Sequence, residues 1–375
     1  MTSPTDPPEI ATFAPHRRVV SWAALAWSTA LSAMGIGWAC GALPLTVPTE
    51  KGFGSVFVVA GPLAATVCAL TLAVVGVLLS LATWAPHSRW GRPVEVGAWS
   101  MAATTLALFV DGQMLAWLGY CMIMPVVGWV VPGLAATWLT LTLDPVHLTM
   151  LFFVLGVGIW VVLALRHRRS VNARCVRCGR GHGWNTHVER RTRARALRVG
   201  RGAVAVACVT ALLYPALRLP WLFGVVVGMS PQDAQALMSD PQSVLVGVGL
   251  GSAGVVGAVL MLGLVQGWGV RFPRWMVGLA GRRVPVPLAV LPATVVAIAL
   301  VAIGRGALLQ VVTLPGSALN VHSVVFVSMG LWGAALGVAT AAYAVRRRVE
   351  CGVCGRGLPE AWPVPVADPA GEGVR

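Results

Sequence analysis

Long apolar stretches separated by short polar segments dominate the chain. Candidate membrane spans lie near residues 20–43, 56–84, 96–118, 147–165, 203–227, 244–268, 286–309 and 322–345. Most of them can cross a hydrocarbon core roughly 30 Å thick, which takes about 20 helical residues. The pattern predicts an all-α integral membrane protein with about eight transmembrane helices. The first apolar run is too long for the apolar region of a signal peptide, so we expect a retained span.

Composition and charge indicate a membrane protein, which we expect in a bacterial plasma membrane. Hydrophobic residues make up 57% of the chain and charged residues 11%, which excludes a soluble domain with an ordinary charged surface. Lys and Arg number 28, and 25 of them fall in segments that share one side if the N-terminus is cytoplasmic. The positive-inside rule therefore predicts cytoplasmic N- and C-termini. The net charge of +15 indicates contact with anionic lipid headgroups.

Two halves of the chain share landmarks in the same order, which predicts an internal repeat. Ala33, Trp38 and Gly41 match Ala216, Trp221 and Gly224; Arg89-Trp90 matches Arg274-Trp275; Asp111 matches Arg305; and Val146-His147 matches Val321-His322. Each copy holds an even number of spans, so we expect parallel four-helix repeats related by an axis along the membrane normal.

The repeat divides the chain into six parts. We expect a disordered cytoplasmic N-terminus (1–18), a first four-helix repeat (19–169), an Arg-rich cytoplasmic loop (170–202), a second repeat (203–348), a short cysteine motif (349–357) and a disordered tail (358–375). The first repeat carries an insertion of 19 residues. Its uncharged stretch 119–143 is hydrophobic enough to be a ninth span. A ninth span would place the Arg-rich loop on the outer side of the membrane, against the positive-inside rule. We expect an interfacial or re-entrant segment there, as an outer cap or a gate.

A cysteine motif closes each half of the chain. Cys175 and Cys178 begin one Cys-x-x-Cys-Gly-Arg-Gly motif, and Cys351 and Cys354 begin the other. This spacing lets two thiolates reach one ion, and both motifs fall on the predicted cytoplasmic side. The motifs resemble the knuckles of zinc ribbons, but lack a Pro after the first Cys. We predict one structural zinc held by all four thiolates, with a redox role or plain reduced thiols as alternatives.

Three charged residues lie within predicted spans, namely Asp111, Arg218 and Arg305. Charges in the bilayer are costly and usually face the interior of a helix bundle. One interpretation is structural: Asp111 pairs with an arginine, and Arg218 binds carbonyl groups near Pro215 and Pro220. The functional interpretation is a polar site for an anionic solute or lipid headgroup between the halves.

Several classes of function are not expected. The chain has no P-loop, no G-x-S-x-G elbow, no H-E-x-x-H and no paired carboxylates at helical spacing, so no enzyme is predicted. The arginine run from Glu189 to Arg201 could neutralise phosphates, but it lacks the interleaved aromatic residues of a nucleic-acid module. We therefore do not expect a nucleic-acid partner.

The use of Arg almost without Lys, the Ala/Gly/Val-rich spans and the terminal C-x-x-C-G-R-G resemble uncharacterised multi-pass membrane proteins of high-GC actinobacteria. The resemblance implies no activity. Two functional hypotheses remain. The slightly favoured one is a transporter or channel-like protein for an anionic solute or lipid. The alternative is a non-catalytic scaffold or regulator that docks a cytoplasmic protein through its zinc knuckles and Arg-rich loop.

Overall fold

The computed structural model describes residues 14–49, 55–84, 87–114, 117, 121, 128, 133–313 and 320–360, and this part of the chain is built from helices. The helices of the first half are α1 (Ala14–Ala39), α2 (Phe57–Ala82), α3 (His87–Phe109), α5 (Leu134–Leu143) and α6 (Pro145–Val171). Those of the second half are α7 (Thr186–Arg218), η1 (Leu219–Phe223), α8 (Pro231–Met238), α9 (Pro241–Leu262), η2 (Gly267–Gly269), α10 (Val286–Thr313) and α11 (Val321–Arg346).

Aromatic side chains form the core of the first half. The helices α1, α2, α3 and α6 pack around one cluster, in which the Phe109 and Phe153 rings stack with centroids 4.1 Å apart. The Trp27 ring lies against Gly156, where an added Cβ would come within 2.2 Å of the indole. The indole Nε1–H of Trp27 donates to the Phe152 carbonyl at 2.9 Å. Gly156 thus makes room for the indole ring of Trp27.

Small residues bring the helices of the second half together. A Cβ added to Gly304 of α10 would lie 2.1 Å from the backbone nitrogen of Gly330 in α11, so the two backbones touch. Gly333 is similarly tight against Ala297 of α10. Such close approach increases dispersion contact between helices in lipid, where the hydrophobic effect does not drive helix association.

The two halves share a pattern of helix pairing. In the first half α1 packs on α2 and on α6, and α3 packs on α6; in the second half α7 packs on α9 and on α11, and α10 packs on α11. In each half, the loop after the first long helix also contacts the start of the last helix, which is α6 in the first half and α11 in the second. Thr46 and Thr149 share a hydroxyl hydrogen bond of 2.7 Å, and Gly228 lies against Val321.

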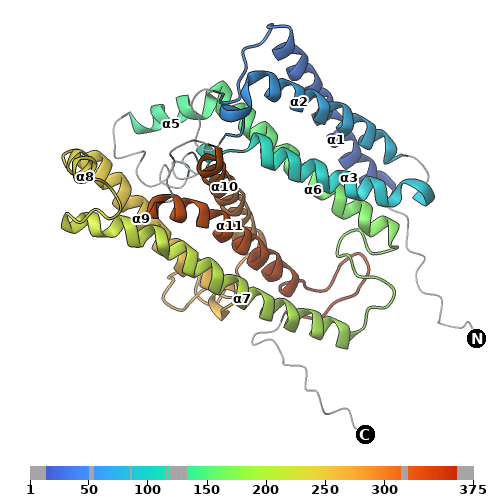
Figure 1. Cartoon of the computed structure of the whole chain (residues 1–375). Coiled ribbons are helices and arrows are strands. Elements are labelled where there is room, and N and C mark those ends of the chain that lie inside the picture. Colours follow the sequence, from blue (N-terminus) through green and yellow to red (C-terminus); the bar gives the residue numbers. More distant parts are fainter. Residues whose placement is uncertain are drawn as a thin grey trace, which may run out of the picture.

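Helix α10 joins the halves within the bundle (Figure 1). Ala299 and Ala302 of α10 are buried in the core cluster of the first half, and α10 contacts α3. Near the same contact, the Arg305 guanidinium donates to the Val110 carbonyl at 2.9 Å. The segments after α6 and after α11 also lie side by side, at the end of the molecule away from α5 and α8 (Figure 1).

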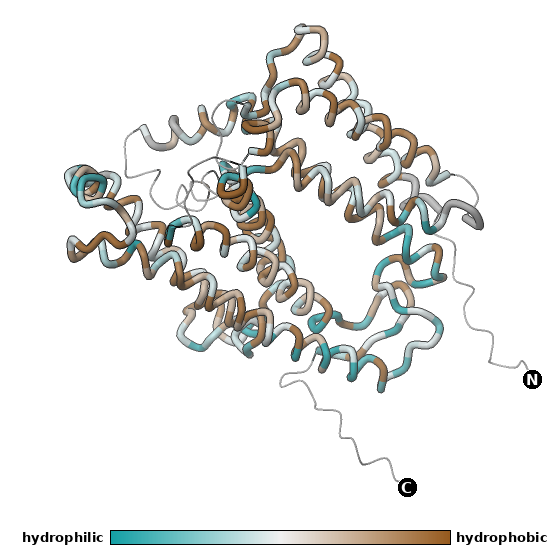
Figure 2. The backbone as a smooth tube through the Cα atoms, viewed as in Figure 1, coloured by the Kyte–Doolittle hydropathy of each residue, from teal (hydrophilic) through white to brown (hydrophobic). Residues whose placement is uncertain are grey.

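Seven of the described helices are long and apolar enough to cross a membrane, namely α1, α2, α6, α7 with η1, α9, α10 and α11. Hydrophobic residues line these helices, whereas hydrophilic residues gather after α6 and at the start of α7 (Figure 2). The predicted all-α membrane class is confirmed, but the count of eight is not.

The third predicted span, 96–118, has the wrong boundaries. Helix α3 begins at His87 and ends at Phe109, so its first turns include Arg92 and Glu95 and lower its hydropathy. Asp111 follows the helix instead of lying within it. Its carboxylate Oδ1 accepts the Gln113 N–H at 3.0 Å, a local bond that competes with helix continuation.

The predicted Arg-rich loop 170–202 is a loop only in its first part. Asn185 caps the start of α7 by accepting the Val188 N–H, and Glu189 adds a favourable charge in the first turn. At about 1.5 Å per residue, the 33 residues of α7 span roughly 50 Å, about 20 Å more than a hydrocarbon core. The first turns of α7 therefore extend beyond the bilayer.

Two other predicted segments lie partly outside the described residues. Of the insertion 119–143, the structure describes the helix α5, which packs on the start of α6, and a few isolated positions before it. Residues 1–13 and 361–375 lie outside the description. The tail predicted as disordered from residue 358 begins in contact with the fold, because the Leu358 and Pro359 carbonyls accept hydrogen bonds from Arg193.

Candidate metal centre

The two cysteine motifs adopt the same turn. In the first, the Gly179 N–H donates to the Cys175 carbonyl at 2.7 Å, and the Cys175 N–H donates to the Arg180 carbonyl at 3.0 Å. In the second, Gly355 donates to Cys351 at 2.8 Å and Cys351 to Arg356 at 3.0 Å. Gly179 and Gly355 have φ of +75° and +64°, which an L side chain rarely adopts. The glycine after each second cysteine therefore allows this turn.

The four cysteines meet at one point although 176 residues separate the motifs. The Sγ atoms of Cys175 and Cys351 lie 3.9 Å apart, and those of Cys178 and Cys354 lie 3.5 Å apart. All four Sγ atoms lie within 4.8 Å of one another. A tetrahedral ion with metal–sulfur bonds of about 2.3 Å would place its sulfurs about 3.8 Å apart. The four cysteines are therefore close enough to hold one metal ion.

The thiols of this cluster differ in acidity. Burial acts to raise the pKa of Cys351, but hydrogen bonds from the Val353 and Cys354 N–H groups and from neighbouring thiols lower it to about 7. Burial raises the pKa of Cys354 to about 12. Near neutral pH, at least one thiol of the metal-free cluster is protonated. Metal binding would displace such protons, so the affinity for metal should fall as the pH falls.

Reciprocal arginine contacts join the two motifs around the sulfurs. Arg180 of the first motif donates to the carbonyls of Val349 and Arg356 at 3.1 and 2.9 Å. In return, Arg356 of the second motif donates to the Gly181 carbonyl at 2.6 Å. Each motif thus supplies an arginine that satisfies backbone carbonyls of the other.

Glu189 of α7 binds Arg180 of the first motif. Arg180 makes two hydrogen bonds to its carboxylate, at 2.9 and 2.6 Å, and Arg193 approaches it at 3.4 Å. Arg193 also donates to the carbonyls of Arg348 and Leu358. All three charged side chains are buried. Sequence reasoning missed this network, although the Arg after each Cys-x-x-Cys-Gly was a visible signal.

The intramembrane charges predicted as one site lie in two places. Asp111 is buried, and Arg305 donates to the carbonyl of its neighbour Val110. Next to Asp111 is a cavity of about 10 Å³, lined in part by Thr46, Thr149 and Phe153. This volume is about that of a single water probe. The described cavity at Asp111 is thus much smaller than a solute site.

Arg218 lies on the aromatic residues of its own segment. Its guanidinium carbon is 4.2 Å from the ring centroid of Trp221 and 5.2 Å from that of Tyr214. Trp221 is itself buried and occupies the space over Gly247 of α9. The structure brings Asp111 and Arg305 together and places Arg218 in a cation–π stack.

Comparison with known proteins identifies no family and no function for the chain. No protein-family model, curated protein or solved structure matches the chain. The resemblance to actinobacterial membrane proteins is not supported by these searches. Function must therefore be inferred from the geometry.

The cysteine geometry predicts one bound metal ion per chain, and Cys351→Ser should lose it. Removing one thiolate leaves three ligands and exposes the ion, so the metal content should fall by at least tenfold after dialysis. Elemental analysis of protein purified without chelator measures this content. Cys208→Ser is the matched control, because Cys208 donates to the Ala258 carbonyl within the bundle. Equal metal content in the wild type and both variants would exclude a four-cysteine site.

Proposed function

We propose that this protein is a non-catalytic scaffold of the bacterial plasma membrane, in which a structural zinc ion joins two halves and a basic cytoplasmic face docks an acidic protein. The observation that carries the proposal is the convergence of four cysteines from the two halves at one end of the molecule. Because all four ligands would be protein thiolates, the ion would have no open position for water or substrate. A metal centre of this kind suits a structural role better than a catalytic one.

Zinc is the metal that the donor set favours. Four thiolates at nearly tetrahedral spacing suit Zn²⁺, which has no geometric preference of its own from d-electrons. The spacing within each motif matches that of zinc knuckles. Iron would also accept four thiolates, and elemental analysis distinguishes the two metals.

We further propose that the halves are parallel repeats with both termini in the cytoplasm. The shared helix pairing and the identical cysteine turns support this repeat. The cysteine motifs meet on one side with α7, α9, α10 and α11 between them, which is an even number of crossings. Arginines concentrate on that side, as expected for cytoplasmic segments.

The docking surface is the exposed face of α7 beyond the bilayer. Arg190, Arg191, Arg195, Arg198 and Arg201 are exposed, and we call them the basic face of α7. Arg191, Arg195 and Arg198 follow helical spacing of four and three residues, so they form one stripe. Glu189 and Arg193 bind the opposite side of this helix to the cysteine motifs. The proposed zinc ion would therefore hold the basic face in a fixed position.

Docking predicts that a photo-crosslinker at position 190 gives one discrete protein adduct in intact cells of the native host. The double variant Arg191→Glu and Arg195→Glu should reduce the adduct by at least tenfold, because it reverses the charge of the stripe. Arg274→Glu is the matched control, since Arg274 is exposed in another basic segment. Absence of an adduct from the zinc-loaded protein, or equal loss in the control, would contradict docking at the basic face of α7.

Transport of an anionic solute is the second candidate, and the contact between Arg305 and the segment that carries Asp111 favours it. This contact joins the two halves within the bundle, where transporters built from repeats bind their solutes. The small cavity at Asp111 means that the halves would have to separate before a solute could enter.

Transport predicts that one class of small anion raises the thermal midpoint of the detergent-solubilised protein by several degrees. Arg305→Gln should abolish this rise, because it removes the cation that would bind the anion. Glu95→Gln should keep it, because Glu95 pairs with the half-exposed Arg168 at 3.5 Å, near the other end of the bundle. If no anion raises the midpoint of folded wild type, the transport candidate fails.

A further inference from the structure

A cavity bordered by arginines opens beside the cysteine cluster. Its volume is about 230 Å³. Arg169, Arg177, Arg180, Arg348 and Glu350 supply its charges, and Cys178 and Cys351 form part of its wall. This volume is large enough for one phosphate group but lies below the roughly 300–1,000 Å³ of pockets for drug-sized molecules.

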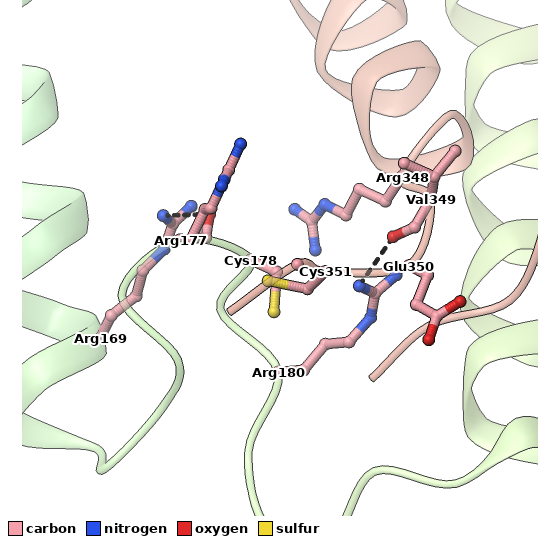
Figure 3. Close-up of a pocket in the computed structure, with 9 residues that line it drawn as sticks. Arg169, Arg177, Cys178, Arg180, Arg348, Val349, Glu350 and Cys351 are labelled. Carbon is pink, nitrogen blue, oxygen red and sulfur yellow. Dashed lines mark hydrogen bonds between the residues drawn. The ribbon is translucent and has the colours of Figure 1, made fainter. Parts of the chain in front are cut away.

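The four arginines fall into two classes. Arg169 donates to the carbonyls of Val176 and Arg177, and Arg180 donates to Glu189 and to backbone carbonyls. These two guanidinium groups hold the cavity wall in place. Arg177 and Arg348 have no protein acceptor for their guanidinium groups within the described part of the chain, and both residues are exposed. Figure 3 shows how their side chains lie.

The charge of the cavity remains positive when its acidic groups are counted. Glu350 contributes one negative charge, and its carboxylate points away from Arg177 and Arg348 (Figure 3). A zinc ion with four thiolates would contribute two more negative charges. Glu189 adds one more negative charge, but its partner Arg193 and the neighbouring Arg356 add two positive charges. With the four lining arginines, these six arginines exceed the four negative charges by two, which favours an anion such as a phosphate group.

The cavity lies where lipid headgroups would be. Arg169 belongs to the last turn of α6, and Arg348 follows the last residue of α11 by two positions. Both helices are long and apolar enough to span a membrane, so their ends mark the level of the bilayer surface. A phosphate could reach the cavity from the bilayer or from the cytoplasm.

We infer that this cavity is a binding site for a phosphate group, in which Arg177 and Arg348 bind the anion and Arg169 and Arg180 support the wall. Guanidinium groups suit phosphate because their donors match its oxygens in pairs. The inference goes beyond the proposed function, because the cavity would bind phosphate whether or not a protein docks on α7. Bound phosphate would bridge the segment after α6 and the segment after α11, next to the metal centre.

The test measures phosphate binding by the zinc-loaded full-length protein. Inorganic phosphate is titrated into protein in nanodiscs of phosphatidylcholine, and thermal midpoints are compared in nanodiscs with and without phosphatidylglycerol. Saturable binding of inorganic phosphate assigns a free phosphate compound as ligand. Stabilisation by phosphatidylglycerol alone assigns a lipid headgroup. Either result supports the site, provided that Arg348→Gln and Arg177→Gln each weaken the effect about tenfold.

Arg274→Gln is the matched control, because Arg274 is exposed and lies outside both the cavity and the basic face of α7. The zinc content of all variants should equal that of the wild type, which separates loss of the anion site from loss of the metal centre. Binding of neither probe by zinc-loaded, folded wild type would overturn the inference. Equal weakening by Arg274→Gln would also overturn it, because the effect would then reflect the overall charge of the protein.

Discussion

Four cysteine sulfurs, supplied by two segments far apart in the sequence, lie close enough to share one ion, and their contact joins the two halves at one end of the molecule. Within the bundle, the halves meet mainly where α10 packs on α3. Lipid provides no hydrophobic force to strengthen such a contact. A structural zinc site contributes about 10–16 kcal/mol of apparent binding free energy at neutral pH. The proposed zinc ion would therefore be the strongest single link between the halves.

The buried arginines around the sulfurs have a clear physical role. A zinc tetrathiolate carries a net charge of minus two, and the loops that hold it leave backbone carbonyls without helix partners. Arg180, Arg193 and Arg356 donate to such carbonyls, and their charges offset that of the proposed centre. Glu189 in turn compensates Arg180 and orients it. The cysteine motifs, the buried arginines and α7 thus form one connected unit. The cavity lies beside the cysteines, and the basic face of α7 lies on the other side of that helix.

The sequence predicted the membrane class and the cysteine cluster for simple reasons. A long apolar run is stable in lipid as a helix, because a helix satisfies all of its backbone hydrogen bonds internally. Cys-x-x-Cys spacing has few uses beyond metal and redox chemistry. Helix ends were predicted less well. The start of α7 at Thr186 was missed because hydropathy ignores polar helices, although Asn185 and Glu189 are good starting signals. Asp111 was placed inside a helix because the apolar run continues past Phe109, whereas the aspartate bonds locally to Gln113. Arg218 was grouped with Asp111 and Arg305 because all three charges lie in predicted spans. Hydropathy carries no information about the Trp221 ring that stacks on Arg218.

Cutting the chain between its halves tests the metal link most directly. A protease site at the exposed Gly183, between the first cysteine motif and α7, would leave one motif on each half. After cleavage in mild detergent, a tag on the first half should retain the second half while zinc is bound. A zinc chelator, or Cys351→Ser, should release it. Full retention after elemental analysis has shown that the zinc is gone would contradict the account, because the contact between α3 and α10 would then suffice to hold the halves.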